Sequence, residues 1–247
     1  LLIRSSDNRA HNGPSRSGSI FGIRTDPAKG VIRGLSLPRD LYVPLSGLPI
    51  LGKSDRLNTA LFWGEYYGAK QGLSAARATV SSLTGVPVNG VVLVRFNLVS
   101  KMVDALGGVE VYFEKPLADA KFSSLFGDRS YLLRFESGWN YLDGARAMEY
   151  IRVRKPDTDF GRMNRNRQLL TRIMGALRSP RKWLGLAAAG PSLWNEIEMQ
   201  LDVKTAIRLA WAIRRDRSQG IEWNSIRKDQ VAPFVTPKGA QVLAADP

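Results

Sequence analysis

The chain has 247 residues, of which 44% are hydrophobic and 23% charged, and its formal net charge is +14. This is an ordinary globular composition with enough apolar material for a sizeable core. No cysteine is present, which excludes thiol nucleophiles, disulfides and cysteine-ligated zinc. The single histidine, His11, excludes a histidine-rich metal centre. Any metal would therefore be a hard ion held by carboxylates, such as magnesium, manganese or calcium.

No apolar run of the chain is long enough to span a bilayer, because the best stretch, Trp183–Trp194, is interrupted by Gly190 and Pro191. The chain begins at Leu1, without an initiator methionine and already inside an expected strand. We therefore expect that a signal or anchor segment precedes it in the full protein. No Pro/Ser/Gly-rich linker lies near the middle, so we expect one α/β domain over residues 1–247.

The first half of the chain alternates strand and helix patterns. The expected strands are Leu1–Ile3, Ser19–Ile23, Val31–Leu37, Val91–Phe96 and Val109–Phe113, and the expected helices are Asn58–Tyr67 and Ser74–Leu83. Asn97 is expected to cap a third helix, whose apolar residues follow at helical spacing. Gly107 and Gly108 have no phosphate-loop spacing, and we expect them to stop this helix and turn the chain into the next strand.

The second half is predicted to be mainly helical. Residues 117–138 are expected to be irregular, with one strand at Tyr131–Phe135. Asp143 can cap a helix that runs to about Ile151. A helix over Phe160–Leu177 would turn Met163, Leu170, Ile173, Met174 and Leu177 inward, and one over Val203–Arg215 would have Ala206, Leu209, Ala210 and Ile213 on its apolar face. These patterns together predict a layered α-β-α sandwich with a central mixed sheet.

The segment from Leu142 to Arg172 is rich in arginine. Its cations are Arg146, Arg152, Arg154, Lys155, Arg162, Arg165, Arg167 and Arg172, against Asp143, Glu149, Asp157 and Asp159. The planar guanidinium fork binds phosphate oxygens in pairs. Apolar residues are interleaved with these cations, which indicates a folded surface and not a loose tail. The segment therefore predicts a site for an anion that carries several charges.

The expected backbone decides which of these side chains can meet one ligand. Pro156 favours extended backbone before it, and in extended backbone Arg152 and Arg154 project to the same side. On the following helix, Arg162, Arg165 and Arg172 share a face, and Asn166 lies one turn beyond Arg162. The alternative is an exposed polar face with local ion-pair partners.

Three acidic or turn segments can contribute to such a site. Asp159 precedes the second helix, where it can cap the helix and still face a ligand. Pro38 marks a strand end, so Arg39 would project from the carboxyl end of that strand; the alternative is a local pair with Asp40. Asp7 follows another strand and offers a ligand for a hard metal, although an aspartate is also common in turns.

These segments, taken in order, resemble the LytR–CpsA–Psr family of cell-envelope proteins. The matching segments between Leu1 and about Leu177 are LLIRSSDNR, RSGS, SLPRDLYV, RLNTAL, MVDALGGVEVYF, LDGARAMEYIRVRK and DTDFGRMNRNRQLL. The later LDVKTAIRLAWAI resembles the usual C-terminal helix of the family. No single motif is decisive, but the ordered set is specific.

The resemblance implies a mixed sheet between helices with an apolar channel for a polyprenyl lipid. It also implies a phosphotransferase that moves a glycopolymer from a polyprenyl-diphosphate carrier to a peptidoglycan sugar hydroxyl, with a pyrophosphatase side activity. Such proteins are anchored by an N-terminal membrane segment and work on the extracytoplasmic face of the plasma membrane. The implied partners are therefore the lipid-linked glycopolymer, peptidoglycan and the membrane, and no nucleic acid.

The same resemblance assigns roles to individual side chains. The diphosphate would bind among Arg16, Arg39, Arg152, Arg154 and Arg162, with Asn166 beside them. Arg39 and Arg152 would also take part in catalysis. Asp159 would be the general base, and Asp7 matches a carboxylate that binds Mg²⁺.

This chain departs from the family pattern at two positions. Gly18 stands where the family has an aspartate that is a second metal ligand, and Asn166 stands where it typically has a glutamine. The first departure leaves a second hypothesis open: a protein that binds a lipid diphosphate or a polymer without turning it over. The basic charge also suggests nucleic-acid binding, but no helix-turn-helix, zinc or RNP pattern supports it.

Overall fold

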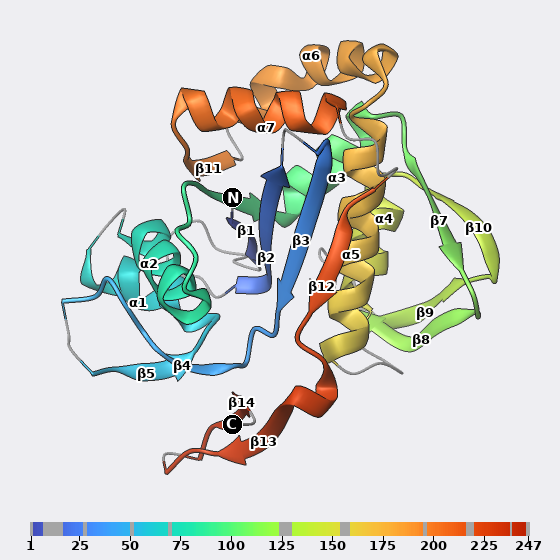
Figure 1. Cartoon of the computed structure of the whole chain (residues 1–247). Helices are drawn as coiled ribbons and strands as arrows, with labels where there is room; N and C mark the ends of the chain where they lie inside the picture. The colour runs from blue at the N-terminus through green and yellow to red at the C-terminus, as the bar shows by residue number, and fades with distance from the viewer. Residues whose placement is uncertain are drawn as a thin grey trace. The chain divides into compact units, whose positions relative to one another are not determined.

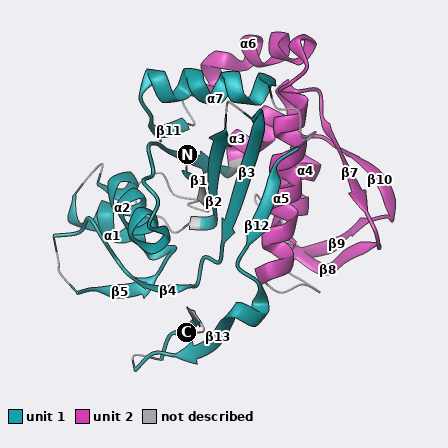
Figure 2. Cartoon of the chain, in the orientation of Figure 1, with its two compact units in different colours: residues 1–96, 197–247 teal, residues 97–196 magenta. Residues whose placement is uncertain are grey.

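The structure, a computed structural model, describes residues 2–6, 17–26, 29–49, 52–68, 71–123, 130–153, 159–194, 197–215, 220–237 and 239–245. Asp7, Arg16 and Arg154 lie outside these residues, so the predictions that rest on them stay predictions. The chain falls into two compact units, and Figure 2 shows them in different colours. Unit 1 combines residues 1–96 with 197–247, and unit 2 comprises residues 97–196.

Unit 1 is built on a six-stranded mixed sheet, and Figure 1 labels most of its strands. Its strands are β1 (Leu2–Ser6), β2 (Ser17–Asp26), β3 (Val31–Leu37), β6 (Val91–Arg95), β11 (Ile197–Gln200) and β12 (Glu222–Ser225). The strand order is β11-β6-β1-β2-β3-β12. The pairs β1–β6 and β3–β12 are parallel and the other three are antiparallel. The prediction of a mixed α/β fold with a central mixed sheet is confirmed.

The helices of unit 1 are α1 (Thr59–Tyr67), α2 (Gly72–Thr84) and α7 (Val203–Arg215). Helix α2 packs against α1, β6 and β11, and α7 packs against β2 and β3. Ala75, Ala76 and Val80 are the buried side of α2. Two smaller ladders complete the unit: β4 (Tyr42–Pro44) with β5 (Ser54–Arg56), and β13 (Val231–Val235) with β14 (Gln241–Ala245), the latter preceded by a 3₁₀ turn, η1 (Lys228–Gln230).

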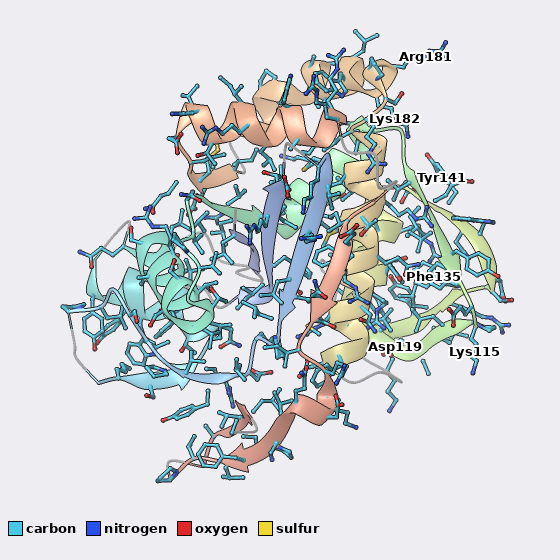
Figure 3. All side chains as sticks on the ribbon, in the orientation of Figure 1. Lys115, Asp119, Phe135, Tyr141, Arg181 and Lys182 are labelled. Atoms are coloured by element: carbon cyan, nitrogen blue, oxygen red, sulfur yellow. The ribbon has the colours of Figure 1, made fainter. Side chains whose placement is uncertain are left out.

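The described residues of unit 2 form two antiparallel ladders and four helices. The ladders are β7 (Val109–Phe113) with β10 (Gly138–Leu142), and β8 (Leu117–Ser123) with β9 (Ser130–Phe135). The helices are α3 (Phe96–Ala105), α4 (Gly144–Arg152), α5 (Asp159–Ala176) and α6 (Pro180–Trp194). An aromatic cluster lies in its core: the ring of Phe135, labelled in Figure 3, stacks on Phe113 at 5.2 Å, and Tyr150 meets Phe113 edge-on at 5.0 Å.

Most predicted elements are present, and the differences have local causes. Asn97 does not cap α3, because the helix already begins at Phe96. Residues 117–138 were expected to be irregular apart from one strand. Strand β8 lies within this stretch, and β10 begins at its last residue. On α5, Ile173 and Met174 are buried as predicted, but Met163 and Leu170 are only half-buried. Leu177, predicted to be the last inward residue of this helix, follows its end and is half-buried as well.

The predicted turn at the end of α3 is confirmed. Gly107 and Gly108 have φ of 68° and 80°, a backbone region that favours glycine. The backbone N–H of Gly107 donates to the Asp104 carbonyl at 2.8 Å. Tyr141 and Lys182, labelled in Figure 3, donate to the carbonyls of Gly107 and Gly108 at 3.1 and 3.5 Å. The two glycines therefore end α3 and lead the chain into β7.

Within the described residues, no helix combines the length and the apolar character that crossing a membrane requires.

Candidate functional site

Helix α4 forms because its first turn is capped from two sides. The Asp143 carboxylate accepts from the backbone N–H of Arg146 at 2.8 Å, as predicted, and the Asp104 carboxylate accepts from that of Gly144 at 2.7 Å. Ala147, Met148 and Ile151 are buried against the unit. The helix extends to Arg152, and the next N–H, of Val153, still donates to the Glu149 carbonyl at 3.1 Å.

Arg152 is therefore the last residue of a helix, and the prediction of extended backbone at this position is wrong. The physical reason is that proline restricts only the residue directly before it, which is Lys155. The Arg152 guanidinium donates to the carbonyl of Ser123, at the end of β8, at 3.1 Å. It also lies 5.3 Å from the centre of the Phe122 ring. Arg152 thus links the end of α4 to the end of β8.

Asp159 was expected to precede the helix as its cap. In the structure it is instead the first residue of α5. Its carboxylate pairs with the Arg162 guanidinium at 3.0 Å, one turn further along the helix. The Asp159 side chain is 54% exposed and that of Arg162 only 17%. A carboxylate in the first turn is favoured there by the partial positive charge of the helix N-terminus. Asn166 follows Arg162 by one further turn and is half-buried.

Arg165 does not belong to a ligand face, contrary to the prediction. Its side chain is 5% exposed, its Nε donates to the Tyr150 carbonyl at 3.1 Å, and its Nη2 donates to the Val153 carbonyl. These carbonyls lie at the C-terminal end of α4, where backbone acceptors lack partners inside the helix. Arg165 therefore fastens the end of α4 to α5. Arg172, the third cation of the predicted face, lies 4.8 Å from the ring of Trp139.

The sequence does contain a signal for the buried position of Arg165. Leu169 and Ile173 follow it at intervals of four residues, and both are buried. The three side chains thus form one stripe along α5. An arginine in line with a buried apolar stripe is a candidate for a buried residue that donates hydrogen bonds to the carbonyls at the end of a neighbouring helix.

We call the group formed by Arg152, Asp159, Arg162 and Asn166 the α4–α5 junction. The structure brings these four predicted residues into one unit, at the end of α4 and the first turns of α5. Helices α4 and α5 are in contact. The junction therefore combines guanidinium groups, a carboxylate and a helix N-terminus, which is the chemistry of an anion site.

A second carboxylate near the end of α4 is already engaged. Glu149 accepts hydrogen bonds from the hydroxyl of Tyr131 and from the Arg146 guanidinium, the latter at 2.9 Å. Burial and the hydrogen bond to Glu149 raise the pKa of Tyr131 to about 12. On α5, burial lowers the pKa of Arg167. The Asp159 carboxylate is more exposed than that of Glu149, with 54% of the side chain accessible against 22%.

Arg39 belongs to unit 1 and lies two residues after the end of β3. Its Nε donates to the Asp40 carboxylate at 3.1 Å, and Arg56 lies 3.7 Å from the other oxygen of that carboxylate. The local Arg39–Asp40 pair, which the sequence left open as the alternative, is thus present. The approach of Arg39 to the α4–α5 junction stays a prediction.

Magnesium binding also stays a prediction. Among the residues that the structure describes, no group of three or more His, Cys, Asp or Glu side chains could hold a metal ion. Gly18 lies in β2 and offers no carboxylate. The prediction therefore depends on Asp7, outside the described residues.

Comparison with known proteins identifies the family. The model of the LytR_cpsA_psr family matches residues 1–242, which include nearly all of both units, so the chain belongs to this family. The polyisoprenyl-teichoic acid–peptidoglycan teichoic acid transferase TagU of Bacillus cereus is 30% identical over 207 residues. This match covers 83% of the chain but 59% of TagU. The transferase TagV of Bacillus subtilis is 30% identical over 181 residues, which are 72% of the chain and 43% of TagV.

Solved structures confirm the fold. The crystal structure of B. subtilis TagV has a TM-score of 0.76 and 22% identity, and the match covers 100% of this chain and 91% of that one. A structure described as TagT bound to LIIa-WTA has a TM-score of 0.73 and 22% identity, with 99% and 83% covered.

Proposed function

We propose that this protein is a phosphotransferase that moves a glycopolymer from a polyprenyl-diphosphate carrier to a sugar hydroxyl of peptidoglycan. The observation that carries the proposal is the α4–α5 junction, in which Arg152 ends α4 and Asp159 and Arg162 lie in the first turn of α5, a helix in contact with α4. The relatives named as teichoic acid transferases support this reaction class.

The junction is suited to a diphosphate for electrostatic reasons. The backbone N–H groups in the first turn of α5 point away from the helix and favour an anion. The Arg162 guanidinium is held near this terminus by Asp159. A diphosphate would compete with the carboxylate for that guanidinium, and the carboxylate is exposed enough to meet a second substrate. Arg152 at the end of α4 would supply a second guanidinium group for the diphosphate.

The reaction exchanges one phosphorus–oxygen bond for another. The oxygen of the acceptor hydroxyl attacks the phosphorus that carries the polymer, and a phosphodiester forms. The bond from this phosphorus to the bridging oxygen breaks, and polyprenyl monophosphate leaves. The hydroxyl proton goes to the Asp159 carboxylate, while the guanidinium groups stabilise the charge on the leaving phosphate. Arg39, Arg16 and Arg154 complete the proposed binding site.

A divalent ion held by Asp7 would add charge neutralisation to these steps. Because Gly18 lacks a carboxylate, a second function is open: a protein that binds the lipid diphosphate or polymer without transferring it. Magnesium titration together with a transfer assay separates the two, since a binder retains affinity for the lipid but forms no phosphodiester. In either case the proposal locates the protein in the cell envelope, outside the plasma membrane and anchored to it.

The test compares variants for binding of a soluble prenyl diphosphate. We expect Arg152→Ala and Arg162→Ala each to weaken binding by about tenfold to a hundredfold, because each removes a charge-assisted contact of about 1.5–3 kcal/mol. Arg181→Ala, on the exposed surface of α6 (Figure 3), is the matched control and should leave affinity unchanged. Asp159→Asn should retain binding and lose transfer. Wild-type affinity in both arginine variants would refute the assigned site.

A further inference from the structure

Helix α7 has one face that is accounted for by the fold. Ala212 is buried, Leu209 and Ile213 are half-buried, and the helix packs against β2 and β3. Leu209 and Ile213 were predicted for this face, whereas Ala210, also predicted there, is exposed. The first turn is held by the Asp202 carboxylate, which accepts from the backbone N–H of Thr205 at 2.8 Å and from its hydroxyl at 2.7 Å.

A second apolar stripe runs along the other side of α7, in solvent. Val203 is 75% exposed, Ile207 62% and Trp211 48%. The three residues follow one another at intervals of four, so successive side chains are offset by about 40° around the helix and lie in one row. The solvent side of a surface helix is ordinarily polar. Three large apolar side chains in one exposed row therefore indicate a surface that binds another molecule or a membrane.

The cations of α7 lie along the same side. Lys204, Arg208, Arg214 and Arg215 are all exposed, and the segment from 203 to 215 contains no acidic residue. Lys204, Arg208 and Arg215 flank the stripe, and the Arg215 guanidinium lies 3.7 Å from the centre of the Trp211 ring. A tryptophan with a cation above its ring is suited to the boundary between apolar chains and polar headgroups.

We propose that this side of α7 is a peripheral membrane-binding surface that lies on an anionic lipid bilayer. Val203, Ile207 and Trp211 enter the headgroup boundary, and the flanking cations contact lipid phosphates. Charge complementarity selects this partner: a second copy of the chain would set four cations against four, whereas an anionic bilayer neutralises them. The inference concerns how the protein lies on the membrane, and it holds independently of the transfer reaction.

The experiment measures sedimentation of the chain with vesicles of phosphatidylcholine alone or mixed with phosphatidylglycerol. We expect binding to the anionic vesicles only, and weaker binding at high salt. Ile207→Ser/Trp211→Ser keeps every charge, and Lys204→Ser/Arg208→Ser keeps every apolar residue of the stripe; each pair should weaken binding by about tenfold. Leu132→Ser, which removes an exposed apolar side chain on β9, is the matched control and should bind like wild type.

Two outcomes would overturn the proposal. If Ile207→Ser/Trp211→Ser binds phosphatidylglycerol vesicles like wild type, the net charge of the chain alone explains the binding. If wild type is a dimer by sedimentation velocity and this variant is a monomer, the stripe covers a second copy. Affinity for a soluble prenyl diphosphate, measured in parallel, should be the same in all these variants, so a failure here is distinct from a failure of the proposed function.

Discussion

The substitution Arg165→Ala tests whether the α4–α5 junction depends on its buried clamp. The guanidinium of Arg165 reaches the carbonyls of Tyr150 and Val153 from α5, and its side chain is 5% exposed. Alanine removes both donors and leaves two carbonyls at the end of α4 without that partner. Water can replace the guanidinium only if the surrounding chain opens.

The size of the effect follows from these two hydrogen bonds. A hydrogen bond to a charged group contributes about 1.5–3 kcal/mol, so the pair contributes about 3–6 kcal/mol. The variant also no longer buries a cation, which offsets part of this loss. We therefore expect a loss of about 3 kcal/mol in the free energy of unfolding, which for a chain of this size lowers Tm by about 6–12 °C. Arg165→Lys keeps the charge but not the fork, and should lie between wild type and alanine.

Urea unfolding and amide hydrogen exchange give the two readouts. Exchange at the end of α4, and specifically at the Val153 amide, should accelerate in Arg165→Ala beyond the change in distant amides. Arg181→Ala, at an exposed arginine of the same unit, should change stability by less than about 0.5 kcal/mol. Equal stability of the two variants, with normal exchange at Val153, would show that Arg165 does not hold the junction.

Two further predictions concern unit 1. A Cβ on Gly34 would lie 2.4 Å from the Trp223 ring, whereas one on Gly22 would meet nothing closer than 3.7 Å. Gly34→Ala should therefore lower the free energy of unfolding, measured in urea titrations, by about 1–3 kcal/mol, and Gly22→Ala should leave it unchanged. Equal effects of the two substitutions would contradict the packing argument. Hydrogen bonds from Thr205 lower the pKa of Asp202, so the carboxylate stabilises α7 above the ordinary aspartate pKa and this contribution is lost as pH falls through the lowered value. Thr205→Val removes the hydroxyl donor and should raise the pKa of Asp202 in a carboxyl NMR titration; an unchanged value would exclude the hydroxyl as a cause.

Hydrophobic patterns within a single segment correctly predicted the strands and helices that depend mainly on that segment. Strand β3 has the predicted bounds, Val31–Leu37, and α7 the predicted bounds, Val203–Arg215, because period-two and helical patterns are readable in a single segment. Strand β10 was missed for a physical reason: its aromatic residues, Trp139 and Tyr141, face outward and are 60% and 63% exposed. Its formation depends on pairing with β7, which lies far away in the sequence.

The arginines show the corresponding limit at the site. The N–H groups of a guanidinium can donate either to phosphate oxygens or to the last carbonyls of a helix. The arginine content of a segment therefore cannot distinguish a ligand-binding role from a structural one. The sequence placed Arg162 and Arg165 together on a ligand face, but the structure separates them. Arg165 is buried against backbone carbonyls, whereas Arg162 pairs with the exposed Asp159. Burial, which depends on how α5 packs, makes the difference.

The proposed anionic ligand and a purely structural role make different demands on the charges of the junction. A structural role would need only charges that balance the two helix ends: Arg152 in the last turn of α4 and Asp159 in the first turn of α5. Arg162 comes in addition to these and pairs with the exposed Asp159. Under the proposed function, a diphosphate at the N-terminus of α5 would compete with that carboxylate for the Arg162 guanidinium. Arg162→Ala should therefore weaken diphosphate binding, whereas a purely structural ion pair predicts a change in stability alone.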